Sequence, residues 1–256
     1  MSTAKPSPRP APASGKGRNA ALVTGGSVGI GRAICESLLD EGRRVVSLDR
    51  VPPGFSHPRL AAIEVDLANR QATRRIAAEV ALAYAPTTLV HNAGVIRPAL
   101  LADVKLADLD ALVELHLAAT ITLVQAVLPA MRASRSGRIV LVSSRAALGA
   151  ATRTVYSATK AALLGLARTW ALELAGDGIT VNVVAPGPVR TDMYHAIVPA
   201  GSEQDARLAA SIPVGRIGEP DDVARAVAFF AAPANGFVTG QTLFVCGGSS
   251  VSSLKV

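Results

Sequence analysis

The chain has 256 residues, of which 50% are hydrophobic, 4% aromatic and 18% charged. A chain of this length can bury a large core without metal or disulfide staples, and so few aromatics imply a core of Ala, Val, Leu and Ile. Two cysteines are too few for a disulfide scaffold. The sequence has no run of about 18 uncharged apolar residues, so it does not predict a membrane span. We therefore expect a soluble, cytoplasmic globular protein with both cysteines reduced.

The net charge of +7 is concentrated at the N-terminus. Residues 1–18 contain four Lys or Arg and four prolines but no acid, which leaves 22 basic against 19 acidic residues in the rest. We expect this Pro/Ala-rich tail to be disordered or polyproline-like, without the apolar stretch of a secretory signal. The scattered charges of the body favour a solvated surface and argue against nucleic acid as a partner.

From Asn19 onward, short apolar runs alternate with helical periodicity. The strands expected in chain order are Ala20–Thr24, Val45–Leu48, Leu60–Val65, Thr88–His91, Ile139–Val142, Ile179–Val184 and Thr242–Val245. The helical patterns between them include 34–39, 76–83, Leu106–Met131, Val155–Ala175 and Pro220–Ala231.

Strands that are apolar throughout are buried on both faces, and strands separated by helices join in parallel. The sequence therefore predicts a three-layer α/β/α Rossmann fold, a doubly wound parallel sheet forming one domain over residues 19–256. The segment 186–217 has several prolines and little periodicity, so we expect a substrate-binding loop there, with a short helix at Ser202–Ser211.

A glycine-rich turn follows the first strand. The segment Thr24–Gly31 leads directly into a helix, whose free N–H groups and positive dipole end suit a pyrophosphate. Asp49 ends the second strand, where a carboxylate accepts hydrogen bonds from the ribose of NAD and repels the 2′-phosphate of NADP. The turn and Asp49 predict dinucleotide binding with NAD favoured, although the adjacent Arg50 leaves NADP open.

A tyrosine and a lysine lie one helical turn apart. Tyr156 and Lys160 share a helix face, so the ammonium is expected near the phenol, where a cation lowers its pKa toward the range useful for acid–base catalysis. Ser143 and Ser144 end the fifth strand at the carboxyl edge of the sheet, where a hydroxyl can hold a substrate carbonyl.

These motifs together resemble the short-chain dehydrogenase/reductase family over residues 19–250, closest to members of the 3-oxoacyl-acyl-carrier-protein reductase type. The matching segments are Thr24–Gly31, Asp66–Leu67, His91–Gly94, the Ser–Tyr–Lys set, 186–191 and the ending 240–248.

The resemblance implies a catalytic set. Tyr156 would be the acid in reduction and the base in oxidation, and Lys160 would bind the nicotinamide ribose. Strand register selects Ser144 as the catalytic serine, with a shortened loop, whereas the usual serine–tyrosine separation selects Ser143. The turn and the resemblance together imply coenzyme contacts from Gly25, Ser27, Gly29, Ile30, Gly31, Asp49, Asp66, Leu67, Asn92, Ala93, Gly94, Tyr156, Lys160, Val189 and Thr191.

Two histidines depart from the family pattern. His116 stands where the resemblance implies an asparagine whose main-chain carbonyl holds a water of the proton relay. We expect His116 to preserve that backbone contact, to contribute a titratable ring to catalysis, or merely to pack in its helix. His91 replaces another common asparagine and is interpreted as strand-end packing. The remaining histidines share no ligand spacing, so no metal site is expected.

The leading hypothesis is an NAD(H)-dependent oxidoreductase that interconverts a secondary alcohol and a ketone. The alternative is a catalytically weak, dinucleotide-sensing regulator of the same fold, supported by His116 and the shortened serine–tyrosine loop. The resemblance also implies a homotetramer or homodimer built through the long helices, in which Leu112, Leu115 and Leu123 form either the contact face or ordinary core. The substrate itself is not readable from the sequence.

Overall fold

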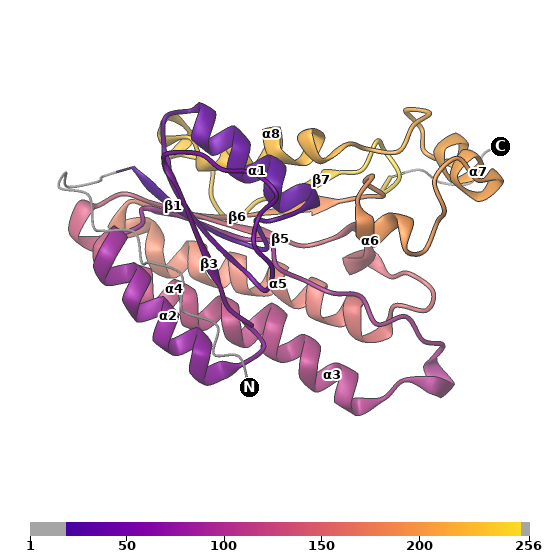
Figure 1. Ribbon diagram of the computed structural model, residues 1–256, viewed down its shortest axis with the longest axis horizontal. Helices are drawn as coiled ribbons and strands as arrows, with labels where there is room; N and C mark the ends of the chain where they lie inside the picture. The colour runs from indigo at the N-terminus through magenta and orange to yellow at the C-terminus, as the bar shows by residue number, and fades with distance from the viewer. Residues whose placement is uncertain (1–18, 252–256) are drawn as a thin grey trace, which may run out of the picture.

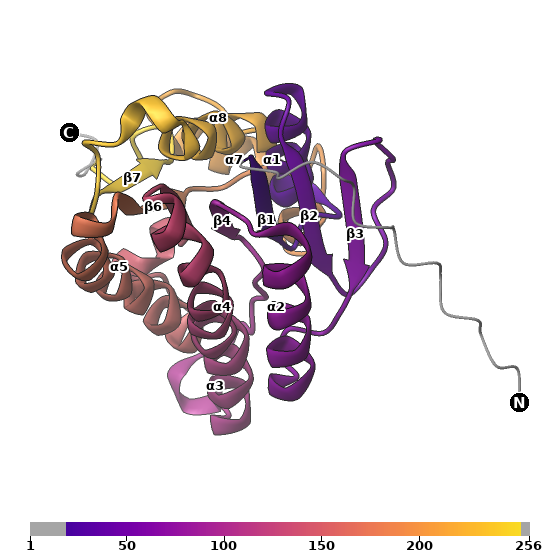
Figure 2. The same cartoon turned by 90° about the vertical axis from the view of Figure 1, so that its left-hand side faces the viewer.

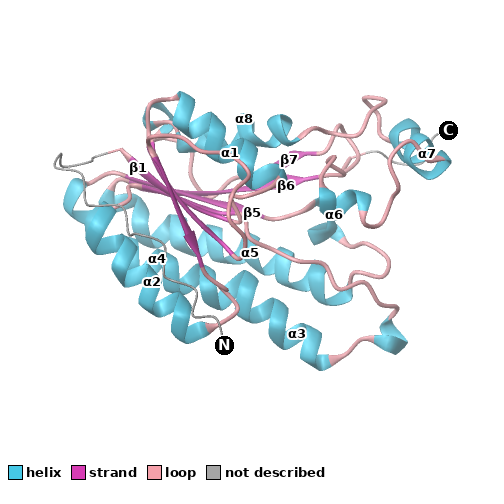
Figure 3. Cartoon of the chain, in the orientation of Figure 1, coloured by secondary structure: helices cyan, strands magenta, loops and turns pink. Residues whose placement is uncertain are grey.

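The computed structural model describes residues 19–251, which form a seven-stranded sheet between two layers of helices (Figures 1 and 3). The predicted tail at 1–18 lies outside the described residues. All neighbouring strands pair in parallel, in the order β3-β2-β1-β4-β5-β6-β7. The strands are β1 (Ala20–Thr24), β2 (Arg44–Asp49), β3 (Leu60–Glu64), β4 (Thr88–His91), β5 (Gly137–Val142), β6 (Ile179–Pro186) and β7 (Thr242–Val245).

The helices cover both faces of the sheet (Figure 2). On one face lie α1 (Gly29–Asp40) and α8 (Pro220–Ala231), and on the other α2 (Arg70–Tyr84), α4 (Ala119–Ser134) and α5 (Thr154–Leu174). Successive side chains of β1 show why the strands are apolar throughout, because Ala21 and Val23 enter one core and Leu22 enters the other. The predicted three-layer Rossmann fold is confirmed.

The sheet order reverses between β1 and β4, and this switch creates a crevice at the carboxyl ends of the strands. The turn after β1, the ends of β2 and β3, and the loops after β4, β5 and β6 all open onto this edge. The residues singled out in the sequence therefore converge from distant positions.

The segment between β6 and α8 is the least regular part of the described chain. It contains α6 (Asp192–His195) and α7 (Glu203–Ser211); α7 lies at the right-hand end of the molecule, and α6 lies nearer the sheet (Figure 1). The Ser202 hydroxyl accepts a hydrogen bond from the Asp205 N–H and caps α7. The helix expected within the substrate loop is therefore present, whereas α6 has no counterpart in the predicted pattern.

The long helical segment predicted after β4 is continuous but not uniform. It begins as α3 (Leu106–Val113), widens into a π-turn at Glu114–Ala118 and continues as α4. By length and composition alone, Leu106–Ser134 is apolar enough to cross a membrane, but α4 packs on α2 and the sheet, as a core helix does. Leu112 and Leu123 are fully buried, and Leu115 is partly buried against the core, so of the two alternatives the structure favours ordinary core.

Candidate active site

The turn after β1 is shaped to admit a ligand close to its backbone. Gly25 and Gly29 have φ of +66° and +53°, a region that side chains rarely adopt. A Cβ on Gly31 would lie 1.8 Å from the Gly25 carbonyl oxygen, so only glycine allows the helix to begin so close to the turn. No side chain caps the first turn of α1, where the N-cap is Val28, and its N–H groups remain available to a phosphate.

A polar cluster fixes the loop after β4 against this turn. The Thr24 hydroxyl oxygen accepts hydrogen bonds from the Asn92 and Ala93 N–H groups, at 3.0 Å each, and lies 3.1 Å from His91 Nδ1. The Asn92 amide donates to the Thr24 and Gly25 carbonyls. His91 is fully buried, in agreement with strand-end packing.

Carboxylates lie at the ends of β2 and β3. Asp49 accepts hydrogen bonds from the Ser27 N–H, at 3.0 Å, and from the Arg50 N–H, at 2.7 Å, while it faces the cavity. Ser27 was expected to contact the coenzyme; instead it is 2% exposed, and its hydroxyl donates to the Val51 carbonyl. Ser27 thus positions Asp49 and does not line the cavity.

The structure separates the two candidate serines. The Ser143 hydroxyl is buried and donates to the Lys160 carbonyl at 2.7 Å, whereas Ser144 is hydrogen-bonded to the Tyr156 side chain. Ser144 also caps the short 3-10 turn Arg145–Leu148 by accepting from the Ala146 N–H. The arrangement favours Ser144 over Ser143 as the catalytic serine. The shortened loop between Ser144 and Tyr156 begins with this 3-10 turn.

Tyr156 lies at the start of α5 and is flanked by groups that favour its phenolate. Burial raises the pKa of Tyr156, while the hydrogen bond from Ser144 and the positive charge of Arg153 act in the opposite direction. We expected Lys160 to be the main influence on this pKa. Instead the lysine ammonium donates to the Val142 carbonyl at 2.8 Å and lies 5.8 Å from the centre of the tyrosine ring.

Lys160 is 3% exposed, and burial lowers its pKa to about 8. Its Nζ sits beneath the cavity, close to where a Cβ on Gly94 would lie. The Lys160 ammonium has three N–H donors and uses one of them for the Val142 carbonyl, so the others remain available to a ligand in the cavity.

His116 lies behind the tyrosine, inside the π-turn. Its Nε2 accepts a hydrogen bond from the Val95 N–H at 3.3 Å, its Nδ1 is 2.9 Å from the Thr159 hydroxyl, and its ring meets that of Tyr156 edge-on at 5.9 Å. Burial, reinforced by the charge of Lys160, lowers the pKa of His116 to about 2. The ring is therefore neutral at physiological pH, with its proton on Nδ1, and is not the titratable group considered from the sequence.

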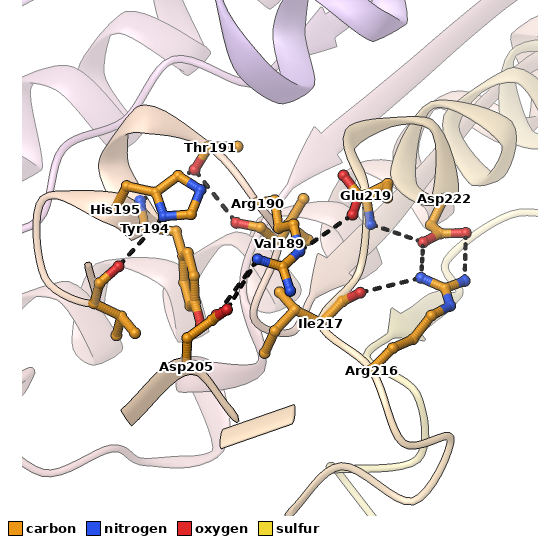
Figure 4. Close-up of polar contacts among 11 residues, drawn as sticks. Val189, Arg190, Thr191, Tyr194, His195, Asp205, Arg216, Ile217, Glu219 and Asp222 are labelled. Atoms are coloured by element: carbon orange, nitrogen blue, oxygen red, sulfur yellow. Dashed lines mark hydrogen bonds and ion pairs between the residues drawn. The ribbon is translucent and has the colours of Figure 1, made fainter. Parts of the chain in front are cut away.

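Ion pairs hold the segment that follows β6 in place (Figure 4). Arg190 reaches Asp205 of α7 at 3.1 Å and Glu219 at 3.3 Å, which precedes α8. The Tyr194 hydroxyl donates to the buried Asp205 carboxylate at 2.6 Å. These contacts bring Val189 and Thr191 to the cavity and α6 over it. Arg190 lies in the matching segment 186–191, but no sequence signal marked Asp205 as its partner.

One cavity of about 900 Å³ gathers these residues. Among the expected coenzyme contacts, those that line it are Gly25, Gly29, Ile30, Gly31, Asp49, Asp66, Leu67, Asn92, Ala93, Gly94, Tyr156, Lys160, Val189 and Thr191. His116 lies beneath it. Within residues 19–251, no three histidine, cysteine, aspartate or glutamate side chains are grouped to hold a metal ion.

The glycine-rich turn after β1, here called the glycine cradle, lies where the sheet order reverses, and the Ser–Tyr–Lys set lies beside it. Together they define an oxidoreductase that uses a nicotinamide dinucleotide. Comparison with known proteins supports this class. A family model described as enoyl-(acyl carrier protein) reductase matches residues 25–250.

Curated relatives and solved structures narrow the class to a family. The chain is 37% identical over 243 residues to (2S)-((R)-hydroxy(phenyl)methyl)succinyl-CoA dehydrogenase subunit BbsD of Thauera aromatica, covering 90% of this chain and 96% of that protein. It is 35% identical over 236 residues to 3-oxoacyl-acyl-carrier-protein reductase FabG of Vibrio cholerae, covering 89% and 96%.

Among solved structures, a putative NAD(P)-dependent gluconate 5-dehydrogenase from Beutenbergia cavernae with bound NADP superposes with a TM-score of 0.84. The identity is 35%, over 92% of this chain and 98% of that one. The chain belongs to the short-chain dehydrogenase/reductase family.

Proposed function

We propose that the protein interconverts a secondary alcohol and a ketone, with Ser144, Tyr156 and Lys160 as its catalytic residues. The observation that carries the proposal is the hydrogen-bonded Ser144–Tyr156 pair, which opens onto the same cavity as the glycine cradle. When bound, the nicotinamide would accept or supply the hydride.

The side chains of the site have complementary tasks in this proposal. Ser144 donates a hydrogen bond that orients the substrate oxygen. Tyr156 gives its phenolic proton to that oxygen in reduction and takes it back in oxidation. Lys160 binds the coenzyme ribose through protons not used by the Val142 carbonyl.

We propose NAD as the preferred coenzyme because Asp49 presents a carboxylate at the end of β2. Structural relatives with bound NADP or NADPH support NADP as the alternative, with Arg50 as the local cation for its phosphate. The ratio of kcat/KM for NADH and NADPH on one ketone decides between them.

Assembly as a homotetramer, or a homodimer, in the cytoplasm remains part of the proposal. Apolar side chains stay exposed on the two long helices, with Ile121 on α4 and Leu172 on α5 at 37% and 87% exposure. The proposal rests on the family resemblance, and these two side chains are the positions at which we expect the contact.

The first test is nicotinamide absorbance across a panel of ketones and secondary alcohols, with both coenzymes. Turnover of at least one compound supports the proposal. Tight coenzyme binding without turnover of any compound would favour the regulator instead. The geometry gives that alternative little support, because the shortened loop leaves Ser144 beside Tyr156.

A further inference from the structure

Three arginines surround the part of the cavity that the coenzyme residues do not occupy. Arg97 follows β4, Arg145 directly follows Ser144, and Arg153 stands three residues before Tyr156; all three line the cavity. The sheet order places the ends of β2 and β3, with their carboxylates, on the other side of β1. The arginines therefore belong to the substrate side.

Among the described residues, Arg145 and Arg153 have no carboxylate partner, and Arg97 has only a long ion pair with Asp108. In the described chain, the Arg145 side chain has no hydrogen bond or ion pair. The Arg153 guanidinium binds only the hydroxyl and carbonyl of Thr152, and Arg97 comes no closer than 3.7 Å to a carboxylate, that of Asp108. By contrast, Arg132 and Arg216 meet carboxylates at 2.8 Å and 2.7 Å.

The backbone before α5 is held in an unfavourable conformation that sets the position of Arg153. Thr152 has φ of +63°, which is rare for a β-branched residue. The conformation is fixed by a hydrogen bond from the Ala99 N–H to the Thr152 carbonyl, at 3.0 Å, and by the bridge between Ala99 and Arg153. Strain maintained in this way beside an active site suggests a functional reason for the position.

The opposite wall of the cavity is apolar. Met193, Ile197, Val198 and Leu208, from the segment that carries α6 and α7, line it, and the charged residue on that wall is Asp192. A ligand complementary to both walls has an anionic end and an apolar end.

We propose that the substrate carries an anionic group, a carboxylate or a phosphate, close to its reacting carbonyl or alcohol. Arg145 and Arg153 bind this group, Arg97 contributes at the rim, and the apolar remainder packs beneath α6 and α7. Guanidinium groups suit this task because they bind carboxylates and phosphates through paired, charge-assisted hydrogen bonds. The inference rests on the proposed function, since it names the substrate class of the same site.

The test compares ligands that differ only in charge. The probes are acetoacetate and 2-oxohexanoate, the methyl ester of each, and acetoacetyl-CoA, whose anionic groups are carrier phosphates. Both kcat/KM and calorimetric binding in the presence of the coenzyme are measured for wild type, Arg145→Gln and Arg153→Gln. Arg74→Gln is the matched control, because Arg74 is exposed on α2, away from the cavity.

We expect a charged probe to exceed its neutral counterpart by about tenfold or more, and each cavity variant to reduce that ratio by about tenfold, while Arg74→Gln keeps it. The ratio of kcat/KM for a charged probe to that for its neutral ester is informative, because any effect of a variant on Tyr156 acts on both probes and cancels in the ratio. Preference for a free acid supports an anion site beside the reacting carbonyl. Preference for acetoacetyl-CoA alone would count against it, because the carrier phosphates lie far from the reacting carbonyl.

Two results would overturn the inference: equal values for acids and esters in the wild type, or a preference that both cavity variants retain. Failure of the proposed function looks different, because it abolishes turnover of every probe. Calorimetry then still decides, since selective binding of a charged probe that is lost in Arg145→Gln and Arg153→Gln supports the anion site. Absence of such binding rejects it.

Discussion

At the scale of single residues, two buried histidines set the chemistry around Lys160. Burial lowers the pKa of His91 to about 3 and that of His116 to about 2, and the lysine charge acts in the same direction. Both rings are held by hydrogen bonds, to Thr24 and Thr159 respectively. Both rings are buried and do not line the cavity, whereas Lys160 does and carries its positive charge there.

These histidines predict acid sensitivity of the fold. Below pH 6.5, the ordinary histidine pKa, these two histidines are protonated in the unfolded chain but stay neutral in the folded chain. The free energy of unfolding therefore falls as the pH falls toward the folded-state pKa values. Each histidine contributes a slope of about 1.4 kcal/mol per pH unit. Urea unfolding between pH 6.5 and 4 should show a shallower slope for His116→Gln than for wild type, and an identical slope would contradict the neutral assignment.

At the scale of elements, the first βα turn depends on glycine at the start of α1. Gly31→Ala places a methyl group against the Gly25 carbonyl and the Asn92 amide, so the turn must open. We expect coenzyme affinity to fall by at least about tenfold in calorimetry.

Gly165→Ala is the matched control for this substitution, because Gly165 lies in α5 with nothing within 4 Å of an added Cβ. It should keep coenzyme affinity and stabilise the fold by up to about 1 kcal/mol. Equal affinities of Gly31→Ala and wild type would refute the close approach of coenzyme to this turn.

The segment over the cavity depends on Asp205, which joins α7 to Arg190 and Tyr194. Asp205→Asn removes the charge that holds both partners, and we expect the KM for ketone to rise about tenfold with a smaller change in coenzyme affinity. Glu203→Gln removes only an exposed pair with Arg207 on the same helix and should change neither value. Similar kinetics in the two variants would show that the Asp205 contacts do not position the substrate wall.

The elements themselves were largely predictable from sequence, for physical reasons that differ between them. The limits of β1, β4, β7 and α8 were predicted to the residue. For β1 and β4 the reason is an apolar run buried on both faces, and for α8 it is a proline at the helix start. β7 is a half-exposed edge strand whose limits follow from its short apolar run. The π-turn around His116 was not predictable, since its hydrogen-bond shift follows from tertiary packing.

The site was predictable only as far as local motifs reach. The spacing of Tyr156 and Lys160 placed both residues on the cavity, yet it did not show that the lysine would bind the Val142 carbonyl. Arg153 and Asp205 act through contacts with residues from other segments, and nothing near them in the sequence marks those contacts.

At the scale of the whole molecule, the proposed assembly through the long helices is tested at Leu172. Leu172→Asp introduces a charge on α5 at a position 87% exposed in the single chain, and it should reduce the mass measured by light scattering. Leu82→Asp on α2, at 90% exposure, is the control and should leave the mass unchanged. The same mass for both variants and the wild type would place any subunit contact elsewhere.

The central claim is that the Tyr156 phenol exchanges a proton with the substrate beside the bound coenzyme. Tyr156→Phe keeps the ring and its edge-on contact with His116 but removes the hydroxyl. The most direct measurement is the turnover of this variant together with its calorimetric affinity for NAD(H) and NADP(H). We predict a loss of kcat of at least about a hundredfold with coenzyme affinity nearly unchanged. Wild-type turnover by Tyr156→Phe would contradict the account.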